Sequence, residues 1–147
     1  ARPEIVICGT DISEDALRCA RLNAEQLALD VDWRCGRWFE SVRGERWDLV
    51  VSNPPYIAEA DAHLSEGDLP AEPRTALVGG ATGLEALQEI ICLTPNALSP
   101  GGWLLLEHGY DQAESVAGML RDAGFSDVST RSDWSGQPRI TGGQWPT

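Results

Sequence analysis

Short apolar runs of strand length alternate along this chain with longer amphipathic stretches. Residues 5–9, 49–51 and 103–107 form the clearest runs, and stretches with apolar residues at helical spacing lie between and after them. This alternation is typical of α/β domains, in which helices pack on a mostly parallel sheet. Because the chain has 147 residues and neither an internal repeat nor a linker, we expect a single domain over residues 1–147.

Local signals place the ends of several elements. Ser13 is expected to cap a helix whose inner face carries Ala16, Ala20, Ala24 and Leu27. Residues 82–85 fit a capping box ahead of a second helix, which Pro95 should end. Asp111 is placed to cap a third helix, and the tail over 128–133 and 139–145 reads as an antiparallel hairpin. Residues 53–82, rich in proline and glycine, predict a long irregular segment of the kind that is usually functional.

The first apolar run lies unusually close to the start of the chain. Residues 5–9 are continuous and β-branched, which predicts a strand buried on both faces and flanked by neighbours. The sequence begins at Ala1 without Met and enters this strand almost at once. We therefore expect the domain to be N-terminally incomplete.

Composition narrows the class of partner. The 23 acidic against 11 basic side chains give a formal charge of −12. Affinity for nucleic acid depends mostly on Lys and Arg that neutralise phosphates, so this balance disfavours such a partner. No apolar stretch approaches the roughly 20 residues of a transmembrane helix, which predicts no membrane span.

The cysteines predict neither disulfides nor a metal site. Cys8, Cys19, Cys35 and Cys92 show no CxxC spacing. We expect them to be buried and reduced, as in a cytoplasmic protein. Only His63 and His108 could join them as ligands, and their contexts are unrelated, so no metal is expected.

The most informative stretch is the hydrophobic strand that runs into Asn53-Pro54-Pro55-Tyr56. Ligands usually bind at such strand ends in α/β sheets. The prolines fix the directions of their carbonyls, and Tyr56 offers a flat face for stacking. The Asn53 side-chain oxygen and the Pro54 carbonyl could then accept the two hydrogens of a planar NH2 group. The alternative is a surface turn stiffened by proline.

An enzyme needs such an arrangement because the lone pair of an amide or exocyclic amine is delocalised. Two acceptors at the N–H bonds draw electron density onto the nitrogen and aim its lone pair. Positioning alone can contribute about 7–11 kcal/mol to a bimolecular transfer. The motif therefore predicts group transfer to a planar amino group, with Asn53, Pro54 and Tyr56 as catalytic residues.

The motif resembles the signature loop of class I S-adenosylmethionine-dependent methyltransferases that act on planar amino groups. Over essentially its whole length the chain is similar to the HemK-type methyltransferases, which modify a glutamine of peptide chain release factors. The stretches that carry this likeness are Asn53-Pro54-Pro55-Tyr56-Ile57, Glu72-Pro73 with Thr75-Ala76-Leu77-Val78, Leu104-Leu105-Leu106-Glu107-His108-Gly109, and Arg139-Ile140-Thr141 with Trp145. The resemblance implies a Rossmann-like class I methyltransferase fold, with a mostly parallel sheet and a C-terminal antiparallel hairpin.

The resemblance also implies where the cofactor S-adenosylmethionine binds. Asp11 matches the acidic residue whose carboxylate accepts both ribose hydroxyls; its alternative role is an Asx turn that feeds the helix at Ser13. Trp38 matches an aromatic residue near the adenine, although a lone tryptophan more often packs in a core. Asn53 would also lie near the methyl group.

By the same resemblance, Asn53, Pro54, Pro55 and Tyr56 form the substrate site. Glu72 either shapes the substrate pocket or only solvates a loop. Glu107 and His108 are expected to be structural. No metal is implied.

Two features depart from the family. Arg37 stands where the family commonly has Asp beside the aromatic residue, which puts an adenine-side acceptor in doubt. The glycine-rich loop and the first strand of the family have no counterpart here. They are expected just upstream of Ala1, which would leave the strands at residues 5–9 and 49–51 unbridged.

The function so implied is transfer of the methyl group of S-adenosylmethionine to the side-chain amide nitrogen of a glutamine in a release factor, leaving S-adenosylhomocysteine. One alternative is an amino-group methyltransferase acting on adenine N6 or guanine N2 of nucleic acid. Another is a non-catalytic fragment unable to bind the cofactor. The Gly142-Gly143-Gln144 sequence near the end coincides with the tripeptide that release factors present to such enzymes, and it reads as the last strand.

Overall fold

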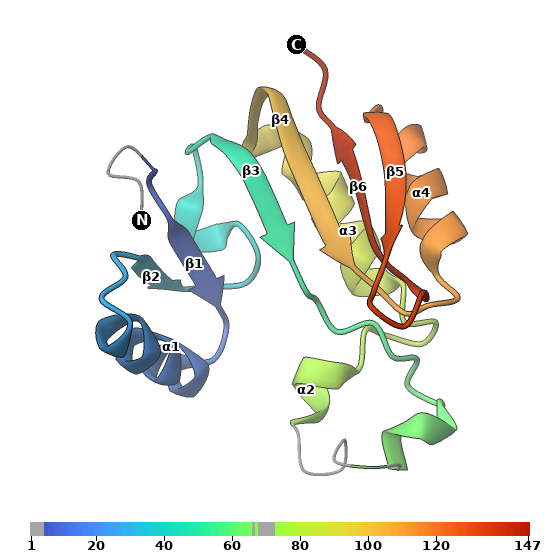
Figure 1. The fold of residues 1–147 in the computed structure, drawn as a ribbon, viewed down its shortest axis with the longest axis horizontal. Coiled ribbons are helices and arrows are strands. Elements are labelled where there is room, and N and C mark those ends of the chain that lie inside the picture. The colour runs from blue at the N-terminus through green and yellow to red at the C-terminus, as the bar shows by residue number, and fades with distance from the viewer. Residues whose placement is uncertain (1–4, 66, 68–72) are drawn as a thin grey trace. The chain divides into compact units, whose positions relative to one another are not determined.

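The computed structural model describes residues 5–65, 67 and 73–147 (Figure 1). The chain divides into two compact units, Ala1–Glu45 and Arg46–Thr147. The described strands form a two-stranded sheet in the first unit and a four-stranded sheet in the second. The strands predicted near residues 5–9 and 49–51 thus belong to different sheets.

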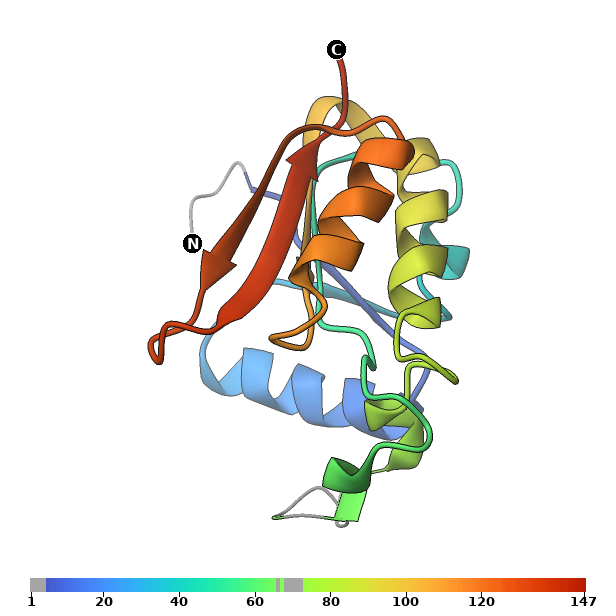
Figure 2. The ribbon, with the colours of Figure 1, turned by 90° about the vertical axis from the view of Figure 1, so that its right-hand side faces the viewer.

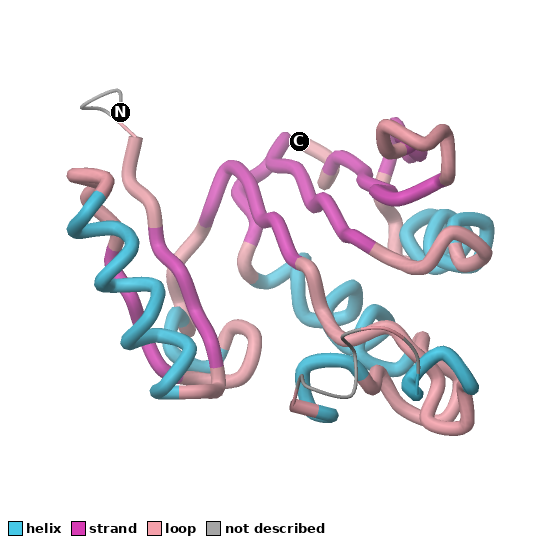
Figure 3. Tube along the Cα trace, turned by 60° about the horizontal axis from the view of Figure 1, so that its bottom comes forward, coloured by secondary structure: helices cyan, strands magenta, loops and turns pink. Residues whose placement is uncertain are grey.

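The first unit is a β-α-β motif. Its elements are β1 (Cys8–Asp11), α1 (Glu14–Gln26), β2 (Asp32–Cys35) and the short 3-10 helix η1 (Glu40–Val42). The two strands are parallel, and α1 lies along them (Figure 3). Ser13 caps α1 as predicted, since its Oγ accepts a hydrogen bond from the Ala16 N–H at 3.2 Å.

Two details of this unit differ from the sequence prediction. The first strand begins at Cys8, and Ile5, Val6 and Ile7 before it are exposed. The buried face of α1 carries Leu17 and Ala24, whereas Leu27 lies beyond the end of the helix and is exposed. Apolar composition predicted burial for residues 5–7, but burial requires neighbours that these residues lack among the described part of the chain.

The second unit is built on a mixed sheet of order β3-β4-β6-β5. Its strands are β3 (Trp47–Ser52), β4 (Leu98–Glu107), β5 (Ser126–Ser132) and β6 (Pro138–Gln144). β3 and β4 are parallel, whereas β6 pairs antiparallel with β4 and β5. The C-terminal antiparallel hairpin is therefore as predicted. Residues 99–102 lie within β4, where the pairing of this strand with β3 is irregular.

The core of this unit lies on one face of the sheet. Side chains along β4 alternate, with Leu98, Leu104 and Leu106 fully buried. The helices α3 (Glu85–Leu93) and α4 (Ala113–Asp122) cover that face (Figure 2). Their buried residues are Ala86, Leu87, Ile90, Ile91, Val116, Ala117 and Leu120.

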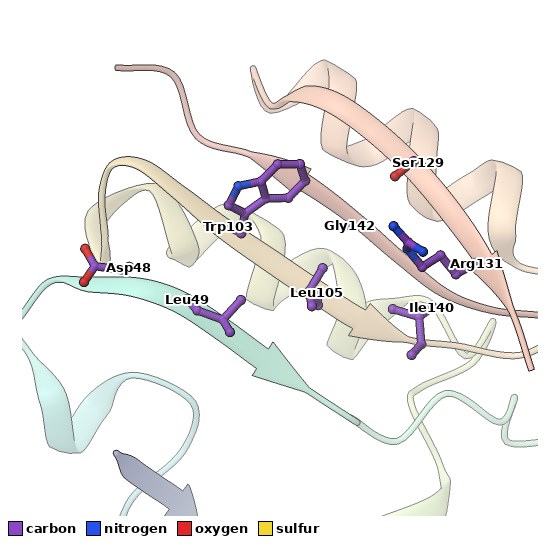
Figure 4. Close-up of a pocket in the computed structure, with 8 residues that line it drawn as sticks. All are labelled: Asp48, Leu49, Trp103, Leu105, Ser129, Arg131, Ile140 and Gly142. Carbon is purple, nitrogen blue, oxygen red and sulfur yellow. The ribbon is translucent and has the colours of Figure 1, made fainter. Parts of the chain in front are cut away.

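The opposite face of the same sheet is more open. It carries a hollow of about 390 Å³ (Figure 4). The hollow is lined by Asp48, Leu49, Trp103, Leu105, Ser129, Arg131, Ile140 and Gly142. Residues 53–56 are not part of this lining, so the hollow and the Asn-Pro-Pro-Tyr motif are separate features of the sheet.

The helix starts in this unit follow the predictions only in part. The capping box at 82–85 is half formed, because Glu85 reaches back to accept from the Thr82 N–H at 3.0 Å. The Thr82 hydroxyl accepts from Leu84 N–H, and the N-cap position of α3 is Leu84. Pro95 follows the end of α3 as expected. At α4 the N-cap is Gln112 in place of the predicted Asp111.

The tip of the β5–β6 hairpin is organised by Asp133. Its Oδ1 accepts from the Ser135 hydroxyl at 2.6 Å and from the N–H groups of Ser135 and Gln137. Its other carboxylate oxygen, Oδ2, pairs with Arg139 at 3.3 Å. These hydrogen bonds, the Ser135 hydroxyl first, hold the pKa of the Asp133 carboxyl below its usual range.

We expect the hairpin to lose stability in acid through this carboxyl. A lowered pKa in the folded state stabilises the fold above the usual pKa, and the stabilisation is lost as pH falls through the lowered value. Asp133→Ala should therefore be less stable than the wild type at neutral pH, and the difference should shrink as the pH falls below the usual pKa range of an aspartate. Urea unfolding of both proteins between neutral and acid pH measures this, and a difference independent of pH would contradict it.

Candidate functional site

The Asn-Pro-Pro-Tyr motif lies directly after β3, at the carboxyl end of a strand in the second unit. Ser52 ends the strand, and Asn53 is exposed, Pro54 buried, and Pro55 and Tyr56 half-buried. No described residue is hydrogen-bonded to the Asn53 side chain. Its amide is therefore available to a ligand, as the sequence pattern requires.

The backbone of this loop is fixed by a second segment that precedes α3. Ile57 N–H donates to the Leu77 carbonyl and Gly79 N–H donates to the Ile57 carbonyl, each at 3.0 Å. Leu77 ends the one-turn helix α2 (Arg74–Leu77). A Cβ placed on Gly79 would lie 2.3 Å from the Pro55 carbonyl oxygen. The close approach of these backbones therefore depends on a glycine at position 79.

Tyr56 is attached to the neighbouring strand. Its hydroxyl donates to Glu107 Oε1, at the end of β4, over 3.3 Å. Burial is the main cause that raises the pKa of the Tyr56 phenol, and the negative charge of Glu107 raises it further. The phenol therefore stays protonated at neutral pH, so Tyr56 can serve as a stacking face and a hydrogen-bond donor but supplies no base.

His108 follows β4 directly, and its side chain is fully buried. Its Nε2 is 2.7 Å from Thr141 Oγ1, which is 2.7 Å from Thr130 Oγ1, and its Nδ1 is 2.8 Å from the Gly109 carbonyl oxygen. Both ring nitrogens are thus occupied. Burial and these contacts support the structural role predicted for His108, and Glu107 likewise holds Tyr56 in place.

Asp11 lies in the first unit at the end of β1. Its Oδ1 accepts from the Ser13 N–H at 2.7 Å, which is the Asx turn named as its alternative role. This contact uses one of about four lone-pair positions of the carboxylate and holds the group in place. The exposed carboxylate keeps acceptors for hydroxyl donors.

Trp38 is positioned in the same unit next to the end of β1. Its carbonyl accepts from Thr10 Oγ1 at 3.1 Å, and its backbone has φ +48°, in the left-handed region. The Arg37 guanidinium lies 5.2 Å from the centre of the Trp38 ring. The buried indole N–H meets no hydrogen-bond partner among the described residues. Asp11 and Trp38 are therefore brought to the same end of the small sheet.

The structure does not bring all the predicted site residues together in one unit. Asn53, Pro54, Pro55 and Tyr56 share one loop of the second unit, whereas Asp11 and Trp38 belong to the first. Glu72 lies outside the described residues. The Gly-Gly-Gln sequence forms part of β6, and the Gln144 amide donates to the Gly101 carbonyl at 2.8 Å, so this glutamine is a strand residue as expected.

The cysteines differ from prediction. All four are free, but none is buried, and Cys19, Cys35 and Cys92 are exposed. Desolvation raises the pKa of Cys8 and of Cys35, so neither thiol is activated as a nucleophile. Among the described residues no three His, Cys, Asp or Glu side chains converge as metal ligands, and no helix is long and apolar enough to cross a membrane.

The sequence did not predict the residues outside the motif that hold the Asn-Pro-Pro-Tyr loop in place. Gln112 donates from its side-chain amide to the Tyr56 carbonyl, and Gly79 and Gly83 pass close to the loop backbone. The glycines stand out in the sequence as part of an irregular segment, but their partners are distant along the chain. Gln112 gives no local signal, because a glutamine near a helix start is ordinary.

Comparison with known proteins shows which proteins this chain is similar to. The methyltransferase small domain matches residues 1–67. The release factor glutamine methyltransferase of Yersinia pestis is 47% identical over 145 residues, which are 98% of this chain and 52% of that protein. The chain spans about half the length of the curated relatives it matches.

Solved structures agree on the fold. A methyltransferase from Pyrococcus furiosus superposes with a TM-score of 0.73 at 18% identity, covering 97% of this chain and 64% of the other. A release factor-specific protein-(glutamine-N5) methyltransferase from Alicyclobacillus acidocaldarius gives 0.53 at 23% identity, covering 97% and 80%. The predicted class I methyltransferase fold is confirmed, as is the resemblance to the release factor glutamine methyltransferases.

Proposed function

We propose, from the premise that this chain is homologous to about half of a release factor glutamine methyltransferase, that its protein methylates a glutamine side chain of a peptide chain release factor. The observation that carries the proposal is the loop after β3, where an available Asn53 amide stands beside the rigid carbonyl of Pro54. Residues 1–147 would then belong to one catalytic domain.

The cofactor of the proposed reaction is S-adenosylmethionine, which supplies an electrophilic methyl group on a sulfonium. The residues present suit it. The Asp11 carboxylate retains acceptors for ribose hydroxyls beside the Asx turn, and the Trp38 ring offers a planar surface at the same end of the sheet. Arg37 stacks on that ring where the family commonly has Asp, so an adenine-side acceptor must come from another residue.

The chain's own residues act on the glutamine amide. The Asn53 side-chain oxygen and the Pro54 carbonyl accept its two N–H hydrogens, which orients the nitrogen and increases its electron density. Tyr56, kept neutral by its raised pKa, packs against the planar amide. Transfer would form the C–N bond as the C–S bond of the cofactor breaks, and the amide nitrogen would then lose one proton to water. Positioning of this kind can supply about 7–11 kcal/mol.

The test is methyl transfer by the full-length protein to a purified release factor. With labelled cofactor, we expect label on a single glutamine, and none on a release factor in which that glutamine is replaced by Asn. Label on RNA or DNA instead would favour the nucleic acid alternative. Titration with S-adenosylhomocysteine of the full-length protein and of the 147 residues compares their affinities. Binding by the full-length protein only would show that this chain alone is a fragment unable to bind the cofactor.

A substitution at Asp11 tests the cofactor side of the proposal. Asp11→Asn keeps the Oδ1 acceptor that the Ser13 N–H needs, but removes the charge and one acceptor. Loss of a hydrogen bond to a charged group predicts about tenfold weaker binding of S-adenosylhomocysteine by the full-length protein, without a change in melting temperature. Asp15→Asn, on the exposed first turn of α1, is the matched control and should bind normally. Normal binding by Asp11→Asn would remove Asp11 from the cofactor site.

A further inference from the structure

We propose that Gln112 is the positioning residue of the Asn-Pro-Pro-Tyr loop. Its side-chain amide holds the Tyr56 carbonyl in place and thereby fixes the directions of the two acceptors, the Asn53 side-chain oxygen and the Pro54 carbonyl. The expected effect of a Gln112 substitution on turnover rests on the proposed function. The contact itself is independent of that function.

The Gln112 amide contacts three separate segments at once. Its Nε2 donates to the Tyr56 carbonyl at 3.0 Å and to the Gly83 carbonyl at 3.4 Å, and its Oε1 accepts from the Gly109 N–H at 2.9 Å. Both amide hydrogens and the amide oxygen are therefore used. Only a side chain with a donor at one end and an acceptor at the other satisfies this pattern.

The structure around Gln112 gives the amide a rigid base. Gln112 is the N-cap residue of α4, which packs on β5, β6 and α3. Gly109, which donates to the Gln112 oxygen, has its own carbonyl held by the buried His108 ring, and His108 is joined to Thr141 on β6. The loop after β3 is thus connected through Gln112 to the C-terminal hairpin.

Gly83 also lies close to the Tyr56 carbonyl. Gly83 has φ +78°, and a Cβ there would lie 2.4 Å from the Tyr56 carbonyl oxygen and 3.1 Å from Gln112 Nε2. The glycine allows the approach but supplies no hydrogen bond to Tyr56. Gln112 is the side chain that bonds to the Tyr56 backbone among the described residues. Because the Tyr56 hydroxyl bonds to Glu107, a shift of its backbone should also disturb that contact.

The test compares Gln112→Ala, Gln112→Glu and the control Gln88→Ala, which lies on the exposed side of α3, in the full-length protein. We expect Gln112→Ala to lower kcat for release factor methylation at least tenfold, with a smaller change in KM. Gln112→Glu keeps the shape and the acceptor for Gly109 N–H but turns a second acceptor toward two carbonyls. It should be at least as impaired as Gln112→Ala. Recovery of kcat by Gln112→Glu would show a space-filling role and overturn the proposal.

A second readout does not depend on activity. In protein labelled with ¹³C at the tyrosine ring, and with Tyr56 assigned through Tyr56→Phe, the Tyr56 phenol should titrate closer to its ordinary range in Gln112→Ala than in the wild type. An unchanged Tyr56 titration would overturn the positioning role even if kcat fell. If the protein methylates no release factor while the Tyr56 titration still moves, the proposed function fails and the positioning role stands.

Discussion

Asn53→Ala should lower the turnover of the full-length protein at least about 10²-fold while leaving its stability unchanged, the loss typical of one preorganised hydrogen-bonding group. The side chain is exposed and bonds to no described residue, so the fold gains nothing from it. Its proposed role is only to accept a hydrogen bond from the substrate amide. Single-turnover methyl transfer and thermal unfolding, measured on the same preparation, separate the two effects.

The matched control for this substitution is Asn96→Ala. Asn96 is also an exposed asparagine of the second unit, at the end of the 3-10 helix η4 (Thr94–Asn96), and it is remote in sequence from the motif. Its replacement should leave turnover normal. Near-normal turnover of Asn53→Ala would remove Asn53 from the mechanism. Loss of folding in Asn53→Ala would instead assign the residue a structural role.

The elements that were predictable from sequence are those with local causes. The cap at Ser13, the end of α3 before Pro95 and the hairpin tip near Ser135 all depend on residues within a few positions of each other. The Asn-Pro-Pro-Tyr motif was also readable, because a hydrophobic strand followed by stiff prolines indicates a site whatever packs around it.

What the sequence did not predict depends on contacts that are distant along the chain. The exposure of Ile5, Val6 and Ile7 is decided by which strands lie beside them, and apolar composition does not contain that information. Gln112 acquires its role only because α4 starts close to a loop that lies 56 positions earlier. Assignment of Asp11 and Trp38 likewise came from resemblance, since an Asx turn and a lone tryptophan are ordinary features by themselves.

Gly79→Ala should lower turnover about 10²-fold, because a misplacement of about 1 Å in an active site can cost that much. A Cβ at position 79 would lie 2.3 Å from the Pro55 carbonyl oxygen and 2.9 Å from its carbonyl carbon. Both are backbone atoms, so no flexible side chain can move aside. The new methyl group must push residues 54–56 away from their present position, and the Pro54 acceptor moves with them. Steady-state kinetics with a release factor substrate measure the effect.

Gly118→Ala provides the control that isolates this steric cause. Gly118 lies in α4, and a Cβ there would meet nothing within 4 Å. Alanine inside a helix is more stable than glycine by about 0.5–1 kcal/mol, so this variant should be slightly more stable and fully active. Gly79 does not have the positive φ that would itself disfavour alanine, so its cost arises from contact alone. If Gly79→Ala folds and turns over normally, the loop tolerates displacement, and the fixed direction of the Pro54 carbonyl is not what the reaction needs.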